Sequence, residues 1–152
     1  MKTATVNLIL SACLGLATMA PARAAVADLE FRSGGATVEE FAAMDRMSGA
    51  YSLKLVLAAK DGGAYLADVD VQVHALPSHT LMLQTRTQGP LLLAALPPGR
   101  YALTASVEVR PGATSTLKRT IVIPASGQQK LVMYFNTGDE VSPESGPEYR
   151  TR

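Results

Sequence analysis

Apolar and polar residues alternate along most of the chain between residues 50 and 136. Successive side chains of a β-strand point to opposite faces, so this period predicts strands that each bury one face. Five sets of residues follow it: Tyr51, Leu53, Leu55 and Leu57; Val69, Val71 and Val73; Tyr101, Leu103, Ala105, Val107 and Val109; Leu117, Ile121 and Ile123; Leu131, Met133 and Phe135.

Turn-forming residues divide the same region into seven pieces of strand length. They occur at Gly62-Gly63, Pro77, Gly89-Pro90, Pro97-Pro98-Gly99, Pro111-Gly112 and from Pro124 to Gly127. Many short strands without intervening helices indicate an all-β fold. We therefore expect residues 50–136 to form a seven-stranded antiparallel Greek-key β-sandwich with one core between two sheets.

A helical pattern precedes the strands. Thr37 and Glu40 have the spacing of a capping box, and Gly49 stands where the helix would stop, so a short helix is predicted over 37–48. One apolar stripe runs along it, formed by Val38, Phe41, Met44 and Met47. The stripe is expected to pack on the sheet, and the alternative is a helix that binds a partner or a membrane surface. Residues 25–36 lack periodicity and are interpreted as a loose leader, which makes 25–49 a leader with one helix.

The stretch L-P-P-G-R-Y places a corner before a long strand. Pro97 and Pro98 fix two successive φ angles and remove two donors, which ends the preceding strand. Gly99 then allows a backbone conformation that a β-carbon disfavours, and the chain turns toward the other sheet. Tyr101 is the first inward residue of the next strand, and its hydroxyl needs a partner in a neighbouring turn. The prediction for these four residues is a structural role.

The N-terminus resembles an export signal. Lys2, an apolar stretch over residues 6–20 and a small-residue motif ending at Ala24 predict cleavage after Ala24, which makes residues 1–24 a signal peptide. The alternative is a lipoprotein anchored through Cys13, but the apolar run continues past that cysteine. The expected location is therefore periplasmic or extracellular. Residues 137–152 carry prolines, glycines and acids with almost nothing apolar, and a disordered tail is expected.

Composition narrows the possible functions. Removing residues 1–24 also removes the single cysteine, so the mature chain has no disulfide, thiol nucleophile or cysteine metal ligand. Its net charge is near zero without a basic cluster, which argues against nucleic acid as a partner. No segment of the mature chain is long and apolar enough to cross a membrane.

Two motifs carry a family resemblance. Y-L-A-D-V-x-V at residues 65–71 and G-P-L-L-L-A-A-L-P-P-G-R-Y at residues 89–101, with alternating strands around them, resemble carboxypeptidase regulatory-like domains. That resemblance implies a transthyretin-type Greek-key sandwich in an exported bacterial protein. It also implies a non-catalytic module.

Few residues suggest catalysis or metal binding. His74 and His79, with Asp68 and Asp70, could be imagined as a divalent-metal site, but alternation points them to solvent and no known ligand spacing is present. The terminal E-Y-R-T-R resembles the Y-R-G-S ending of the hydrolases that open 5-hydroxyisourate. The predicted first strand, however, lacks the histidine of that family, and Thr151 and Arg152 replace its glycine and serine. We therefore expect no enzyme activity, no metal and no cofactor.

Two binding hypotheses remain. The leading one is a structural or protein-interaction component of the cell envelope, which would use exposed strand edges or the helix. The alternative is a carbohydrate-binding module, since exposed aromatic rings stack on sugars. The chain has no tryptophan, and Tyr51 and Tyr101 fall on predicted core faces. Tyr65 and Tyr134 are therefore the candidate ring surfaces for a polysaccharide.

Overall fold

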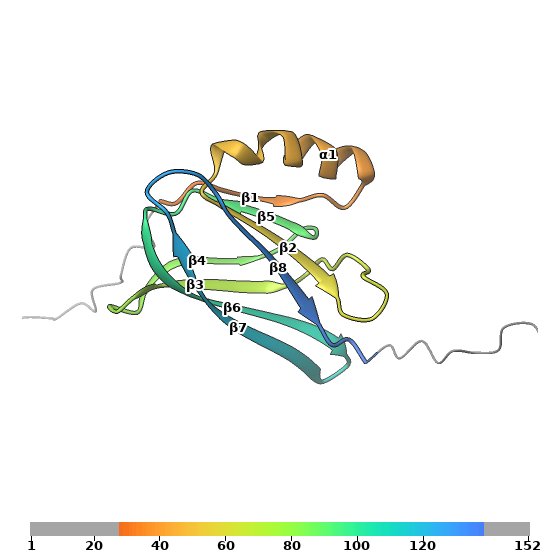
Figure 1. The fold of residues 1–152 in the computed structure, drawn as a ribbon. Helices are drawn as coiled ribbons and strands as arrows, with labels where there is room; N and C mark the ends of the chain where they lie inside the picture. Colours follow the sequence, from red (N-terminus) through yellow and green to blue (C-terminus); the bar gives the residue numbers. More distant parts are fainter. Residues whose placement is uncertain (1–27, 139–152) are drawn as a thin grey trace, which may run out of the picture.

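The protein is a sandwich of two four-stranded sheets with one helix against an outer face (Figure 1). The structure, a computed structural model, describes residues 28–138. Sheet A has the order β1 (Phe31–Gly34), β5 (Leu91–Ala94), β2 (Leu53–Ala59), β8 (Gln129–Phe135). Sheet B has the order β4 (Thr80–Arg86), β3 (Asp70–Leu76), β6 (Gly99–Arg110), β7 (Ala113–Ile123). The helix is α1 (Val38–Met47), and a 3-10 turn, η1 (Ser48–Ala50), follows it.

The expected all-β class with one short helix is confirmed. Residues 50–136 contain seven strands, and the described residues contain an eighth, β1, which lies before residue 50 and was not expected. The prediction of purely antiparallel pairing is wrong, since β2 and β8 run parallel while every other pair of neighbouring strands is antiparallel. Alternation reports which face of a strand is buried and carries no information about strand direction.

The core lies between the sheets and is built from the predicted alternating positions. Leu53, Leu55 and Leu57 of β2 and the valines at 69, 71 and 73 are fully buried. Leu103 from β6 and Phe135 from β8 complete the same cluster. Tyr51 is the exception, because it precedes β2 and packs in a second cluster outside sheet A. Its expected place on the same face as Leu53 is therefore wrong.

Strand β1 forms within the segment that was expected to be a loose leader before the helix. Phe31–Gly34 pairs in register with β5, and the Ala95 N–H donates to the Glu30 carbonyl at 2.9 Å. The turn between β4 and β5 also lies very close to β1. A β-carbon at Gly89 would be 2.3 Å from the Gly34 carbonyl oxygen. Glycine at position 89 thus allows the turn before β5 to lie directly against β1.

Helix α1 begins as predicted, with the Thr37 side chain accepting from the Glu40 N–H at 3.2 Å. The α-helix ends at Met47, two residues before Gly49, and that glycine lies in η1. Only part of the apolar stripe packs: Met44 is buried, whereas Val38 is 82% exposed. The helix therefore docks on sheet A through the middle of the stripe.

Under the helix lies a second, smaller cluster. Met44 and Phe41 contact Leu91 and Leu93, which are the outward side chains of β5. The helix thus covers β5, so all four residues of β5 are buried although a strand normally buries one face. The outer face of β8 remains open, and Figure 1 shows α1 above β1 and β5.

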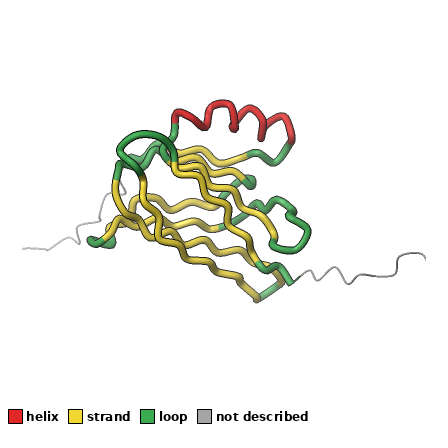
Figure 2. The backbone as a smooth tube through the Cα atoms, in the orientation of Figure 1, coloured by secondary structure: helices red, strands yellow, loops and turns green. Residues whose placement is uncertain are grey.

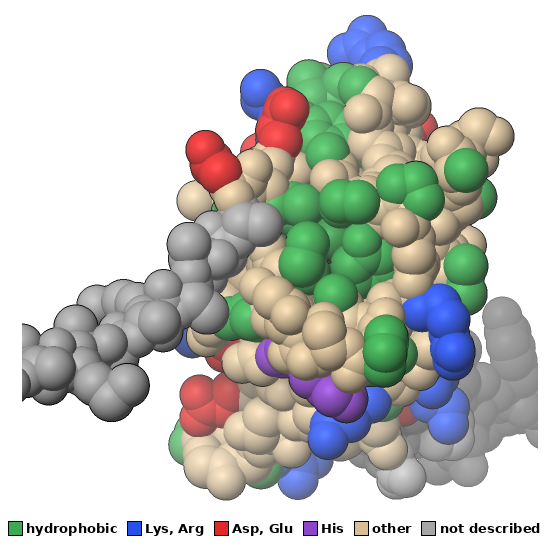
Figure 3. Space-filling view, turned by 90° about the vertical axis from the view of Figure 1, so that its left-hand side faces the viewer, with side chains coloured by type: hydrophobic (Ala, Val, Ile, Leu, Met, Phe, Trp, Pro, Cys, Tyr) green, Lys and Arg blue, Asp and Glu red, His purple; other side chains and the backbone are tan. Residues whose placement is uncertain are grey.

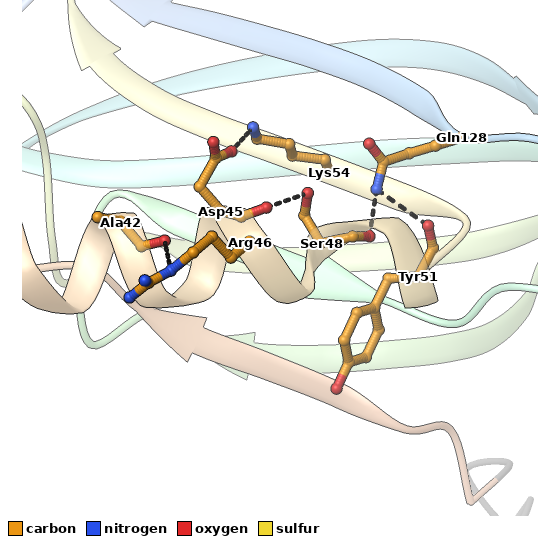
Figure 4. A network of polar contacts seen from close by, with 7 residues as sticks. All are labelled: Ala42, Asp45, Arg46, Ser48, Tyr51, Lys54 and Gln128. Atoms are coloured by element: carbon orange, nitrogen blue, oxygen red, sulfur yellow. Dashed lines mark hydrogen bonds and ion pairs between the residues drawn. The ribbon is translucent and has the colours of Figure 1, made fainter.

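Polar contacts fix the C-terminal end of α1 (Figure 4). Lys54 donates to Asp45, and this hydrogen bond together with the charge of Lys54 lowers the pKa of the Asp45 carboxyl. The side-chain amide of Gln128, in the β7–β8 loop, donates to the carbonyls of Ser48 and Tyr51. These contacts connect α1 and η1 to the end of sheet A where the parallel strands β2 and β8 begin.

Several predictions fall outside the described residues. The signal peptide with Cys13 and the hydrolase-like ending lie there, as does the tail from residue 139 onward. Of the expected tail, Thr137 is buried, and the Gly138 carbonyl accepts from Arg110 at 2.8 Å. No helix within residues 28–138 is long and apolar enough to span a membrane.

Candidate functional site

The predicted corner lies at one end of the sandwich, where the chain passes from β5 in sheet A to β6 in sheet B. Pro97 and Pro98 are exposed in this crossing, and Gly99 has a φ of 154°, which side chains disfavour. Tyr101 is buried against the core, and its hydroxyl donates to the Pro97 carbonyl at 2.6 Å. Burial also raises the pKa of the Tyr101 hydroxyl. These contacts hold the chain at the crossing and present no reactive group.

The same end of the molecule carries the histidines. His74 lies near the end of β3 and His79 in the turn that leads to β4. Figure 3 shows this end, with hydrophobic side chains at its centre and histidine side chains below them. Asp68 and Asp70 lie at the other end of β3, where both form ion pairs with Arg86. The structure therefore does not bring these four residues together.

No three His, Cys, Asp or Glu side chains within residues 28–138 are close enough to hold a metal ion. A hollow of about 560 Å³ lies at the Asp68 end of the sandwich. Its lining includes Asp68, Arg86, Glu108 and Arg110, which are acidic and basic groups open to solvent. This arrangement offers no nucleophile beside a base.

Two exposed aromatic residues, Tyr65 and Tyr134, lie on the outer face of sheet A instead. We call the group of Phe41, Ala58, Tyr65, Val132 and Tyr134 the tyrosine surface. Tyr65 is 60% exposed, Tyr134 56% and Val132 45%, which is unusual for large apolar side chains. An exposed apolar group of this kind is typical of an interaction site.

The register of β2 explains why the two tyrosines share a face. Ala58 pairs with Tyr134 on the β8 side, and it forms a bridge with Tyr65 on its other side. Residues directly opposite in a sheet point to the same face. Ala58 is itself buried, with one tyrosine on each side of it.

The β2–β3 connection brings Tyr65 to this position. Residues 60–69 turn back along β2 (Figure 2), and the Leu66 N–H donates to the Leu57 carbonyl at 3.0 Å. Tyr65 then stacks on Phe41 of α1, with ring centroids 5.2 Å apart and 14° between the ring planes. The helix thereby fixes the orientation of one ring of the surface.

A hollow of about 280 Å³ adjoins the stacked rings. It is lined by Phe41, Tyr65 and the residues 35–38 that lead into α1. Val38 borders this hollow and is 82% exposed, so the first position of the apolar stripe does not pack internally.

Sequence reasoning identified Tyr65 and Tyr134 as exposed rings, but it missed Phe41 and Val132. Phe41 looked like an ordinary helix-packing residue, and Val132 occupies the solvent side of an alternating strand. The parallel register of β2 with β8 was the missing information, because it brings residues from distant segments to one face.

Comparison with protein-family models, with curated proteins and with solved structures found no match to this chain.

Proposed function

We propose that the chain is a non-catalytic exported module that binds a protein of the cell envelope through the tyrosine surface. The observation that carries this proposal is the exposure of Tyr65, Val132 and Tyr134 on one side of a well-packed sandwich. Leaving such side chains in water is unfavourable, by about 25 cal/mol per Å² of apolar surface, so a partner that covers them gains stability.

The finer family assignment is part of the same proposal. We infer a transthyretin-type, carboxypeptidase regulatory-like sandwich formed by the seven strands from Leu53 to Phe135, with β1 and α1 as additions. The strand count in this region and the position of the L-P-P-G-R-Y corner between the two sheets support it. The apolar N-terminal residues support an exported location in the periplasm or outside the cell.

A polysaccharide is the second candidate ligand. It is favoured by the two half-exposed tyrosine rings on either side of Ala58, because rings in this position can stack on sugar faces. A protein partner is preferred since Val132 and Val38 extend the surface with aliphatic side chains, which suit an apolar protein patch better than hydroxyl-rich sugars.

The test compares capture by the wild-type chain with capture by a Tyr65→Ala, Tyr134→Ala double variant. The matched control is Val122→Ala, which removes an apolar side chain that is 57% exposed on β7 of the other sheet. From envelope extracts we expect one protein to be retained by the wild type and the control and lost from the double variant. Equal capture by all three chains would refute the assignment of the surface.

The same three chains applied to a glycan array separate the two candidates. A glycan signal that disappears only in the double variant would favour the polysaccharide. Binding of the wild type to protein alone would favour the envelope partner.

A further inference from the structure

The two sheets present four edge strands, and three of them carry features that oppose pairing with another chain. Strand β1 is four residues long. The register of β4 shifts opposite Val73 and His74, which leaves Met82 without a partner and forms a bulge. Strand β7 has Lys118 and Arg119 at its centre. Short length, bulges and central charges all protect sheet edges.

Strand β8 has none of these protections. Its seven residues pair with β2 without a register shift, and it contains no proline or glycine. Its only charged residue is Lys130, near its start. An edge of this length and regularity is a template for strand addition.

The free hydrogen-bonding groups of β8 can be identified from its pairing with β2. The Gln129 N–H donates to the Ser52 carbonyl, and the Phe135 carbonyl accepts from the Lys60 N–H. Both groups of a residue point to the same side in a parallel ladder, so the odd-numbered residues face β2. The N–H and C=O groups of Lys130, Val132 and Tyr134 therefore point away from the sheet.

These three residues also carry the exposed side chains of the strand. Within residues 28–138, one hydrogen bond reaches their outward backbone groups: the Gln129 side-chain amide donates to the Lys130 carbonyl at 3.3 Å. An incoming strand can replace that contact.

We propose that β8 pairs with β8 of a second copy of this chain, antiparallel and centred on Val132. In this register Val132 lies opposite Val132 of the second copy, and Lys130 lies opposite Tyr134 of the second copy. All the outward residues then form hydrogen-bonded pairs, in which each residue exchanges both backbone bonds with its partner. The two copies of sheet A become one continuous sheet.

The side chains make this register self-complementary, which is the reason for choosing a second copy as the occupant. Two valines meet at the two-fold axis, and each lysine lies beside a tyrosine ring, where a cation is attracted to the ring face. No like charges are opposed. A symmetric dimer requires such a self-complementary patch, because the same residues contribute from both subunits.

This inference uses the outward backbone groups of β8 and the side chains of Lys130, Val132 and Tyr134, whereas the proposed function also requires Tyr65, so the two can fail separately. Tyr65 lies on the other side of β2 from β8 and makes no contribution to the edge. Tyr65→Ala is therefore expected to leave the dimer intact while it weakens binding of the envelope partner.

The first experiment measures molar mass by sedimentation at increasing concentration of the full chain. The wild type is expected to reach twice the chain mass. Val132→Pro removes an outward donor and places a ring where the incoming strand would lie, so it is expected to remain at the mass of one chain. Val132→Thr keeps the N–H and the β-branched shape, and it should still dimerise.

The second experiment tests the register even if Val132→Pro is unstable. In a Cys13→Ser background, which removes the only native thiol, mild oxidation should cross-link Val132→Cys chains. Hydrogen-bonded pairs place their Cα atoms about 5.5 Å apart, which a disulfide can span. Tyr134→Cys is the matched control, because the two copies of residue 134 would lie about 14 Å apart, four residues along the strands.

Two results would overturn the proposal. One is a wild-type chain that sediments at the mass of a single chain at every concentration. The other is cross-linking of Tyr134→Cys as efficient as that of Val132→Cys, which would exclude this register.

Discussion

Replacing Tyr101 with phenylalanine tests the corner that joins the two sheets. The substitution keeps the ring, which is buried in the core with 4% of the residue exposed, and removes the hydroxyl that donates to the Pro97 carbonyl at 2.6 Å. The packing of β6 is thus preserved, and only the hydrogen bond between Tyr101 of β6 and Pro97 in the β5–β6 connection is lost.

The expected cost is about 1 kcal/mol of unfolding free energy. A hydrogen bond between neutral groups contributes about 0.5–1.5 kcal/mol net, and a buried group left without a partner costs up to about 3 kcal/mol. Pro97 is an exposed residue and this hydrogen bond is only partly buried, so the lower range applies. Urea denaturation followed by far-UV circular dichroism measures this difference. The slope of unfolding free energy against urea concentration is expected to be the same in Tyr101→Phe and the wild type.

Tyr134→Phe is the matched control, because it removes the same hydroxyl from a side chain that is 56% exposed. Its effect should stay within about 0.5 kcal/mol, as for most surface substitutions. Equal stability of Tyr101→Phe and the wild type would refute the reasoning about the corner.

The same variant has a pH signature. Burial raises the pKa of Tyr101 above its ordinary value of 10.0 in the folded chain. The folded state then holds the proton more tightly than the unfolded state, so this stabilisation is complete below pH 10 and is lost as pH rises through the folded pKa. The wild type should lose stability in that range, and Tyr101→Phe should lose less. Parallel losses in both chains would contradict this explanation.

Three further predictions concern the core and the contacts of sheet A. Leu55→Ala empties a fully buried position and should cost about 2–5 kcal/mol in urea denaturation, and a cost below about 1 kcal/mol would mean that the site is not packed as described. Gly89→Ala forces a β-carbon against the Gly34 carbonyl and should lower the free energy of unfolding by about 1–3 kcal/mol, measured by thermal unfolding. The control Gly49→Ala has open space around the new β-carbon and should be neutral, and equal melting temperatures of the two variants would contradict the close approach. Gln128→Ala removes two hydrogen bonds and should lower the free energy of unfolding by about 1–3 kcal/mol. Amide hydrogen exchange at the C-terminal end of α1 should become faster, and unchanged exchange would show that these hydrogen bonds do not stabilise the helix.

Sequence pattern predicted the core well because burial imposes a two-residue period. Val69, Val71 and Val73 were identified from alternation alone, and all are fully buried. Strand β1 was not predicted, because its residues F-R-S-G have no apolar alternation and join the sheet through backbone pairing with β5. Pairing of this kind depends on a segment about sixty residues away in the chain.

The candidate site was predictable only in its parts. The exposure of Tyr65 and Tyr134 followed from their positions outside the apolar faces, but their approach to Ala58 depends on register. Tyr51 shows the opposite error, since a single bend before β2 moves it from the expected core to the layer beneath the helix. Its hydroxyl there donates to Glu30 at 3.1 Å.

The parallel pairing of β2 with β8 has a consequence for the order of events during folding. Strand β2 is central to sheet A, yet one whole side of it remains unpaired until residues 129–135 have been synthesised. Contacts that span so much of the chain close slowly, because the intervening loop must first be ordered. A nascent chain thus cannot complete the core between its sheets until β8 has been synthesised, although most of the core residues of β2, β3 and β6 are already present.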